Sequence, residues 1–519
     1  MKQTIHKLAQ VAGALALLLG MSQPAQAVID GITGPTFNLK AAPGYISTAD
    51  GNNQYVWGFA DADGTVAMQY PGPTLIVNQG DTVIVNLQNA LPVPVSILFP
   101  GQSNVISSTN PESQAGLVTR EAALGGSVSY SFVATEPGTY MYHSATQQAL
   151  QLEMGLVGAL IVRPNVAEPL RQAYSHVNTS FDYEYLFLLT EMDPAIHAQV
   201  EQQALPGGIL FQMQELGSQN AGLQTQLVQA DAAINAKLSE LAATVPFSTA
   251  YFEVLGQLAP LINDQIALGV QVSAAVDQLA VLEQQYLAGG VVDISKPFPT
   301  LWFINGRNGP DTLLDANVPW LPNQPYNILP RMHPGEKLLM RVVSAGRDLH
   351  PFHTHGNNTW LIARDGRMLE SAPGMGPDLA SSNYTLTTVP GQTYDATYEW
   401  TGKGLNWDIY GHAPGDPMEP SEYGPDHGKA FPEISTGVPL MLPNVLDLAE
   451  GQFYSGSPFL GSKEAPRPGQ AKTNAFGGYF HMWHSHNEKE LTNDDIFPGG
   501  MLTLVIIEPH GVDIPDTQS

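Results

Sequence analysis

The sequence predicts a mainly β protein with two β-sandwich domains and an inserted α-helical hairpin. Gly and Pro supply 91 of the 519 residues (50 plus 41), whereas charged residues make up only 13%. Short alternating runs such as Thr82 to Leu87 and Ser127 to Phe132 follow Gly-containing turns, which is typical of half-buried strands. Between residues 194 and 289, apolar residues instead recur every three or four positions, which indicates helices.

The pattern changes also predict the domain boundaries. The break around residues 243–248 separates the two arms of the hairpin, and Pro260 is expected to kink or interrupt the second arm. A packing or oligomer-contact role is favoured for this hairpin over a catalytic one. The predicted segments are a signal peptide (1–27), a first sandwich (28–165), a linker and strand (166–193), a helical insertion (194–292) and a second sandwich (293–519).

The N-terminus is typical of an export signal. Lys2 and Lys7 accompany the short apolar run Leu8 to Leu19, and Ala25 and Ala27 offer a small-residue cleavage site. We therefore expect Sec-type export, cleavage after Ala27, and a periplasmic or secreted protein. No later stretch has eighteen consecutive apolar residues, so a membrane span is not expected.

The net charge and the cysteine content exclude several classes of function. The chain has 48 acidic and 21 basic residues and a net charge of −27, so electrostatic binding to nucleic acid is not expected. The absence of cysteine excludes disulfides, thiolate metal ligands and thiol catalysis. Any metal site must use other side chains.

Two His-x-His pairs are the strongest chemical signal. His353 and His355 are two residues apart, as are His484 and His486, so on strands the rings of each pair face the same side. Imidazole suits copper, zinc and iron, and copper binds most tightly among the divalent ions. The sequence therefore predicts that the two pairs converge on a metal, with copper favoured.

At these motifs the chain resembles the multicopper oxidases, which are built from cupredoxin-like Greek-key β-sandwiches. The resemblance covers both β regions but not the helical insertion. It implies copper as cofactor, with O2 and a small reductant as partners. The similar stretches are Pro71 to Thr74, Gly80 to Val83, Gly138 to Ser144, His350 to Gly356 and Trp483 to Glu490.

The departures from the family pattern predict a degenerate type 1 copper site. The family's fourth motif carries a cysteine where this chain has Ser485, and a later histidine where it has Glu490. His350 would be the surviving ligand, but a hydroxyl cannot replace the thiolate of such a site. We expect no type 1 copper and a hydrogen bond from Glu490 or Ser485 to His350 instead.

The family's trinuclear copper ligands are also incomplete. Leu98, Pro100 and Ala145 stand where the resemblance implies histidines, although His143 remains. The surviving set supports one or two copper ions rather than a complete trinuclear centre. The expected metal ligands are His143, His353, His355, His484 and His486.

Together these observations favour an exported copper-binding protein of multicopper-oxidase type. If it is an enzyme, it is an oxidoreductase with a mono- or dinuclear histidine-bound copper. Two alternatives stay open: a non-catalytic copper-binding or resistance protein, and a structural protein that assembles through its hairpin. The family resemblance also implies a homo-oligomer, such as a trimer, as an expected state. No substrate or catalytic residue is predicted. His412, Met418 and His427 are interpreted as ordinary residues of a loop-rich stretch, Thr401 to Phe476.

Overall fold

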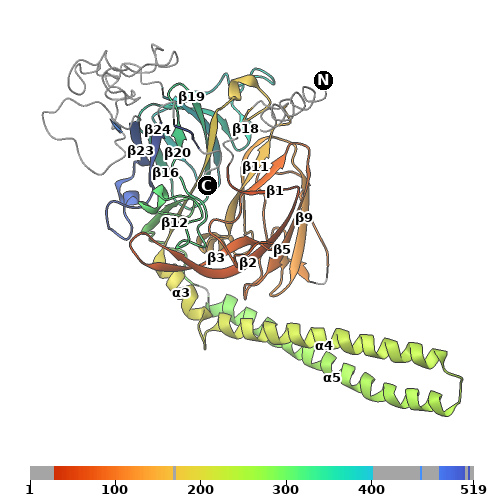
Figure 1. The fold of residues 1–519 in the computed structure, drawn as a ribbon. Helices are drawn as coiled ribbons and strands as arrows, with labels where there is room; N and C mark the ends of the chain where they lie inside the picture. The colour runs from red at the N-terminus through yellow and green to blue at the C-terminus, as the bar shows by residue number, and fades with distance from the viewer. Residues whose placement is uncertain are drawn as a thin grey trace, which may run out of the picture.

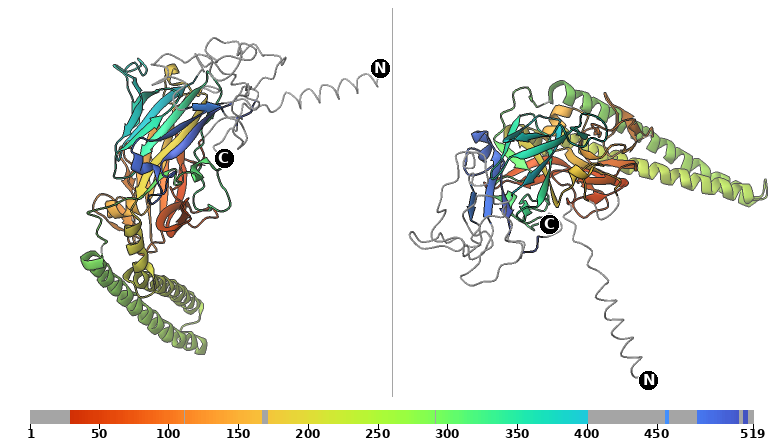
Figure 2. Two further views of the ribbon diagram at one scale, coloured as in Figure 1. Left: turned by 90° about the vertical axis from the view of Figure 1, so that its left-hand side faces the viewer. Right: turned by 90° about the horizontal axis from the view of Figure 1, so that it is seen from above.

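A computed structural model describes residues 29–110, 112–166, 171–290, 292–400, 456–458, 479–508 and 512–514. The predicted signal peptide and His412, Met418 and His427 lie outside the described residues. Two β-sandwiches form the body of the molecule, and a long helical hairpin projects from it (Figures 1 and 2). The predicted fold class is confirmed.

The first sandwich consists of two main sheets that close over one apolar core. Their strand orders are β3-β2-β5-β9-β6 and β1-β4-β11-β10. Alternating runs bury every second side chain, as in β5 and β9. The strands are β1 Ile32–Thr33, β2 Thr36–Ser47, β3 Asn53–Asp61, β4 Leu75–Asn78, β5 Thr82–Asn89, β6 Ile106–Ser107, β9 Ser127–Val133, β10 Gly138–His143 and β11 Val157–Arg163, and a separate ribbon pairs β7 Ser113–Ala115 with β8 Arg120–Ala122.

The second sandwich has the same two-sheet plan. One sheet has the order β13-β12-β15-β21-β17-β18 with β19 beside β17, and the other β14-β24-β23-β16-β20 with β22 beside β23. The strands are β12 Tyr183–Met192, β13 Leu301–Ile304, β14 Arg331–Met332, β15 Lys337–Ser344, β16 His350–Thr354, β17 Thr359–Arg364, β18 Arg367–Met368, β19 Ser381–Asn383, β20 Thr385–Thr388, β21 Thr393–Glu399, β22 Gly456–Pro458, β23 Tyr479–Ser485 and β24 Leu502–Ile507.

The position of strand β12 shows that the hairpin is attached to the second sandwich. The sequence pattern assigns this strand to a linker, but β12 pairs with β15 in parallel and with β13 in antiparallel register, inside the second sandwich. The hairpin therefore leaves the second sandwich after β12 and returns to it at β13. Since β12 lies more than a hundred residues before its neighbours in the chain, sequence order alone could not reveal this pairing.

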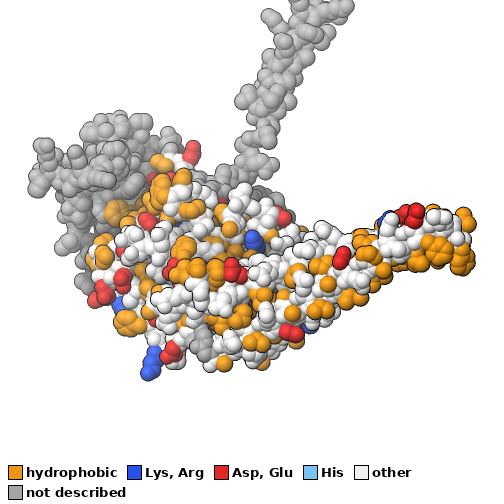
Figure 3. Space-filling view, turned by 90° about the horizontal axis from the view of Figure 1, so that it is seen from below, with side chains coloured by type: hydrophobic (Ala, Val, Ile, Leu, Met, Phe, Trp, Pro, Cys, Tyr) orange, Lys and Arg blue, Asp and Glu red, His pale blue; other side chains and the backbone are white. Residues whose placement is uncertain are grey.

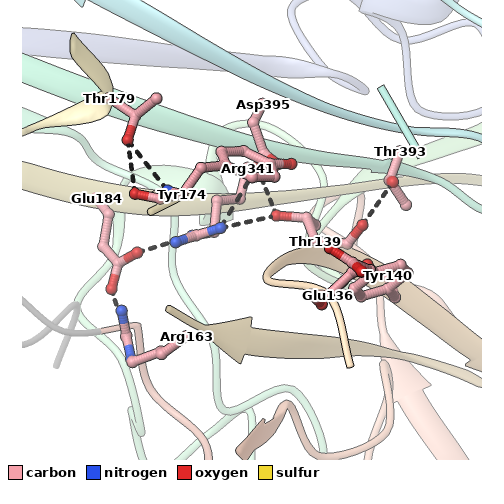
Figure 4. Close-up of polar contacts among 10 residues, drawn as sticks. All are labelled: Glu136, Thr139, Tyr140, Arg163, Tyr174, Thr179, Glu184, Arg341, Thr393 and Asp395. Carbon is pink, nitrogen blue, oxygen red and sulfur yellow. Dashed lines mark hydrogen bonds and ion pairs between the residues drawn. The ribbon is translucent and has the colours of Figure 1, made fainter. Parts of the chain in front are cut away.

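A buried polar network and an apolar layer join the two sandwiches. Leu186 and Leu188 of β12 pack in one cluster with Met141 and Ile161 of the first sandwich. Beside them, the buried Arg341 donates to Glu184 across 2.7 Å. Figure 4 shows this network, whose ion pairs and hydrogen bonds link Thr139 and Arg163 to Glu184, Arg341 and Asp395. The sandwiches therefore share a buried interface in which charges are paired.

The hairpin consists of α4 (Ile209–Ala243) and α5 (Thr249–Gln285), preceded by the short α3 (Pro194–Ala204). Asp193 caps α3 by accepting a hydrogen bond from the Ala195 amide at 2.9 Å, and Ser248 caps α5 in the same way. α5 runs through Pro260 as one continuous helix, so the expected interruption is absent.

By length and composition alone, the segment Thr249–Ala288 is apolar enough to cross a membrane. The criterion of eighteen consecutive apolar residues did not select this segment, because polar residues are scattered along it. One such helix is weak evidence for a membrane span. Only 6% of its most apolar window is buried in the chain, so most of this apolar surface is exposed. The exposed face of α5 is therefore an unexplained feature of the fold.

Candidate metal centre

Two neighbouring strands bring the His-x-His pairs together. β16 and β23 are antiparallel, and His353 lies directly opposite His484 in their register. His355 and His486 lie just beyond the paired residues, where the His486 amide donates to the Pro351 carbonyl at 2.8 Å. The alternation of a β-strand thus places all four rings on one side of the sheet, as the spacing predicts.

The four rings form a compact cluster. The ring centre of His353 lies 4.5 Å from that of His355, 5.6 Å from that of His484 and 5.2 Å from that of His486. The rings of His355 and His484 are 5.0 Å apart. His353, His355 and His484 are buried, whereas His486 is exposed at the edge of the cluster. The two pairs therefore converge.

Backbone carbonyl groups set the orientation of two rings. Nδ1 of His353 lies 2.7 Å from the Tyr384 oxygen, and Nδ1 of His484 lies 2.6 Å from the Ser485 oxygen. In the neutral tautomers these contacts favour, Nδ1–H donates and Nε2 keeps its lone pair. The same arrangement, with Nδ1 held and Nε2 available, orients histidines that bind metals.

His355 and His484 approach each other through their ring nitrogens. Their Nε2 atoms are 3.0 Å apart, and the tautomer of His484 makes His355 the donor between them. The backbone of His355 is fixed as well, because Tyr398 Oη and Trp483 Nε1 each donate to its carbonyl at 3.1 Å. Gly356 follows with φ 96°, a conformation that glycine adopts without strain.

The surroundings keep these imidazoles neutral. Burial, followed by the neighbouring histidines, lowers the pKa of His355 to about 3, and burial is also the main cause that lowers the pKa of His353 to about 4. The pKa of His484 is lowered too, again chiefly by burial. Metal binding requires deprotonated ligands, so these rings are in the correct form at neutral pH.

The cluster fits copper through its donor atoms. Two nitrogens that bind one metal at about 2.0–2.1 Å must lie within about 4 Å of each other, and the Nε2 atoms of His355 and His484 meet this condition. No group of three or more His, Cys, Asp or Glu residues is arranged to hold a metal within the described part of the chain. Two imidazoles, rather than four, therefore lie close enough to share one ion, and His355 would bind through Nε2 once its proton moves from Nε2 to Nδ1.

His143 is found apart from this cluster. Its backbone pairs with Leu98, one of the positions where the resemblance implies a lost histidine. Its buried ring places Nδ1 2.9 Å from the Ser144 oxygen, and burial lowers its pKa. Among the described residues it makes no ring contact or hydrogen bond with the four histidines of the second sandwich, so the structure does not bring the fifth predicted ligand to them.

The predicted hydrogen bond to His350 is present. His350 Nδ1 lies 3.0 Å from Glu490 Oε2, whereas the Ser485 hydroxyl accepts from the Asn487 amide instead. On its other side, His350 Nε2 lies 3.0 Å from Glu191 Oε2. We call Glu191, His350 and Glu490 the carboxylate–histidine triad, and all three side chains are buried.

The triad holds a proton on His350. Burial alone would lower the pKa of this ring, but its hydrogen bonds to Glu191 and Glu490 outweigh burial and raise the pKa to about 9. Glu191 also accepts from the Arg347 and Asp348 amides, and Glu490 accepts from Asn487. Both nitrogens of His350 are therefore occupied by hydrogen bonds.

Glu191 is the site residue that the sequence reading missed. It lies on β12, 159 positions before His350 and on the far side of the helical insertion. A usable signal was present: Glu191 is the one charged residue in the mostly apolar run Tyr185 to Met192, all of it buried in the structure. A buried carboxylate in a strand needs a partner, and here that partner is His350.

The comparisons with known proteins relate part of the chain to a known family. Residues 40–167 match the family model described as multicopper oxidase. A multicopper oxidase of Talaromyces pinophilus is 36% identical over 104 residues, 20% of this chain and 16% of that protein. Copper resistance protein A of Pseudomonas syringae pv. tomato is 32% identical over 124 residues, 24% of this chain and 19% of that protein.

The matches are local. An L-ascorbate oxidase of Brassica rapa subsp. pekinensis is 29% identical over 144 residues, 27% of this chain and 23% of that protein. The chain thus spans less than a quarter of the length of these curated relatives. A blue copper oxidase structure from Nitrosomonas europaea aligns over 91% of this chain and 85% of its own, with 16% identity and a TM-score of 0.44.

Fold and site define a cupredoxin-like, two-sandwich protein with a candidate copper centre. The resemblance to the multicopper oxidases is confirmed, and the match to the family model lies in residues 40–167, which include most of the first sandwich. This relationship implies copper as the cofactor, without fixing the number of ions.

Proposed function

We propose that this chain is an exported copper protein that binds one copper ion between its His-x-His pairs and uses it in oxidoreductase chemistry without type 1 copper. The observation that carries the proposal is the His355–His484 pair, with Nε2 atoms 3.0 Å apart. The carboxylate–histidine triad supports the proposed absence of type 1 copper, because both nitrogens of His350 are engaged by carboxylates.

The chain's own residues would prepare the site in three ways. His355 and His484 would supply the metal-binding nitrogens, with His353 and His486 beside them. Tyr398 and Trp483 hold the carbonyl of His355 and so its position. The buried rings stay neutral, which leaves their lone pairs for a metal. Bound copper would supply one-electron redox chemistry towards oxygen and a small reductant.

A copper titration tests the proposal. The double variant His355→Gln/His484→Gln should bind copper at least about 100-fold more weakly than the natural chain, because it removes both placed nitrogens. His176→Gln is the matched control: its Nδ1 only accepts from the Asn178 amide on another part of the surface. Equal copper affinity in the natural chain and the double variant would contradict the proposal.

A copper-binding protein without turnover is the second candidate, and the match to a copper resistance protein favours it. The two candidates differ in one measurement, oxygen consumption by the copper-loaded protein with a reductant present. Oxygen uptake that disappears in His355→Gln/His484→Gln supports the oxidoreductase. Tight binding without uptake supports the non-catalytic protein.

A further inference from the structure

Helix α5 carries two apolar seams, of which α4 covers only one. The inner seam is buried or half-buried in the hairpin and includes Val254, Leu258, Leu261, Leu268, Val272, Ala275 and Leu279. The second, which we call the outer seam, lies on another face of the helix. Its positions also alternate in steps of three and four, the spacing of a coiled-coil interface: Phe252, Leu255, Ala259, Ile262, Ile266, Gly269, Ser273 and Val276.

The outer seam is open to solvent. Phe252 is 56% exposed, Ile262 40% and Ile266 57%. At the free end of the hairpin it continues into the turn, where Val245 and Phe247 are 72% and 81% exposed. Figure 3 shows hydrophobic side chains along the hairpin and gathered at its free end. An apolar surface of this length, on one face of one helix, marks an interaction site.

The charge pattern of α5 argues against binding to the surface of an anionic membrane. Helices that lie on membranes carry Lys and Arg on their polar face, but Thr249–Gln285 contains neither. Its carboxylates Glu253 and Asp264 lie off the outer seam, and an anionic bilayer would repel them. The positions flanking the seam, Gly256, Asn263 and Val270, are uncharged, although Asp277 borders it near the body.

Small residues in the seam favour another helix as the partner. Ala259, Gly269 and Ser273 lie between the large apolar side chains. A glycine inside a helix costs about 1 kcal/mol relative to alanine, so Gly269 is unfavourable for α5 alone. Small residues shorten the distance between two packed helices, so a helix packed on this seam would offset the cost.

We propose that the outer seam binds the outer seam of a second copy of this chain, so that two hairpins pair into a four-helix bundle. Two copies with a net charge of −27 each repel at any charged face, and the uncharged seam is a surface where they can meet. Burying its large apolar side chains on both copies removes on the order of 1,000 Å² from water, close to the lower end of specific interfaces at about 1,200 Å².

Cysteine cross-linking tests this pairing, because the chain has no cysteine of its own. Ile266 lies near the middle of the seam, so it meets its counterpart in a parallel pairing and Ile262 in an antiparallel pairing centred on the seam. Ile266→Cys, alone or mixed with Ile262→Cys, should therefore form a disulfide-linked dimer under mild oxidation. Gln271→Cys, equally exposed but on a different face of α5, is the matched control and should stay monomeric. Equal cross-linking of both variants, or of neither, would overturn the proposal.

Light scattering after size exclusion gives an independent test on the full chain. The natural protein should have the mass of two or more copies at micromolar concentration. Ile262→Glu/Ile266→Glu should weaken association at least about 100-fold, because it buries charges in the seam, whereas Gln257→Glu/Gln271→Glu should not. Circular dichroism checks that both variants keep their helices. A monomeric natural chain, or one that sediments with neutral phosphatidylcholine vesicles through this seam, would refute self-association.

Discussion

Two histidine sites on one strand of this protein have opposite chemistry. His350 and His353 are three residues apart on β16, and both are buried. His353 lies among other imidazoles, and burial is the main cause that lowers its pKa to about 4. His350 lies between two carboxylates, whose hydrogen bonds outweigh burial and raise its pKa to about 9. Neighbouring side chains, rather than depth alone, decide whether a buried histidine is a free base or a cation.

The largest expected effect is a loss of stability when the carboxylate–histidine triad is disrupted. Glu490→Ala should lower the free energy of unfolding at pH 7 by about 3–5 kcal/mol, because it leaves a buried cation short of one partner. Urea unfolding measures the change. Glu488→Ala removes an exposed carboxylate from the same short helix, and a surface substitution of this kind changes stability by less than about 0.5 kcal/mol. A loss of similar size in both variants would show that His350 does not depend on Glu490.

The pH dependence of stability should separate the two sites further. Because folding raises the pKa of His350 from its ordinary 6.5 to about 9, the folded state holds this proton more tightly than the unfolded state does. The resulting stability, about 3 kcal/mol, is fully present below pH 6.5 and is lost as pH rises through 9.

Urea unfolding of the natural chain and of His350→Gln at pH 6 and pH 9.5 measures this contribution. The advantage of the natural chain should shrink between the two values. An advantage that stays constant, or grows with pH, would mean that His350 is neutral in the folded protein.

A smaller effect, on copper affinity, is expected from a substitution beside the histidine cluster. Tyr398→Phe removes one of the two donors to the His355 carbonyl and should weaken copper binding about 10-fold. Tyr394→Phe is the matched control, since Tyr394 lies on the same strand β21 as Tyr398 but its hydroxyl donates to Gln392 and touches neither site. Calorimetric copper titration compares the two. Unchanged affinity in Tyr398→Phe would show that this contact does not position the metal ligands.

The sequence predicted all four rings of the histidine cluster but only part of the carboxylate–histidine triad. The His-x-His spacing was enough to place four rings on one face, because side chains alternate along a strand whatever its partners are. Glu490 was predicted from its position in a recognisable motif. Glu191 was missed because the pairing of β12 with β15 crosses the whole helical insertion.

The outer seam of α5 was missed for a different reason. Its residues follow helical spacing just as the inner seam does, and only packing distinguishes the two. The sequence showed only that apolar residues of the hairpin recur every three or four positions, and the structure shows that part of them face solvent. Periodicity therefore predicted the helices but not which of their faces is covered.

Electron paramagnetic resonance of the copper(II)-loaded protein tests the central claim most directly, because coupling to imidazole nitrogens reports which histidines bind the ion. The natural chain and His350→Gln should both show such coupling, and His355→Gln/His484→Gln should lose it. Coupling that disappears in His350→Gln but persists in His355→Gln/His484→Gln would place the copper in the carboxylate–histidine triad and contradict the account.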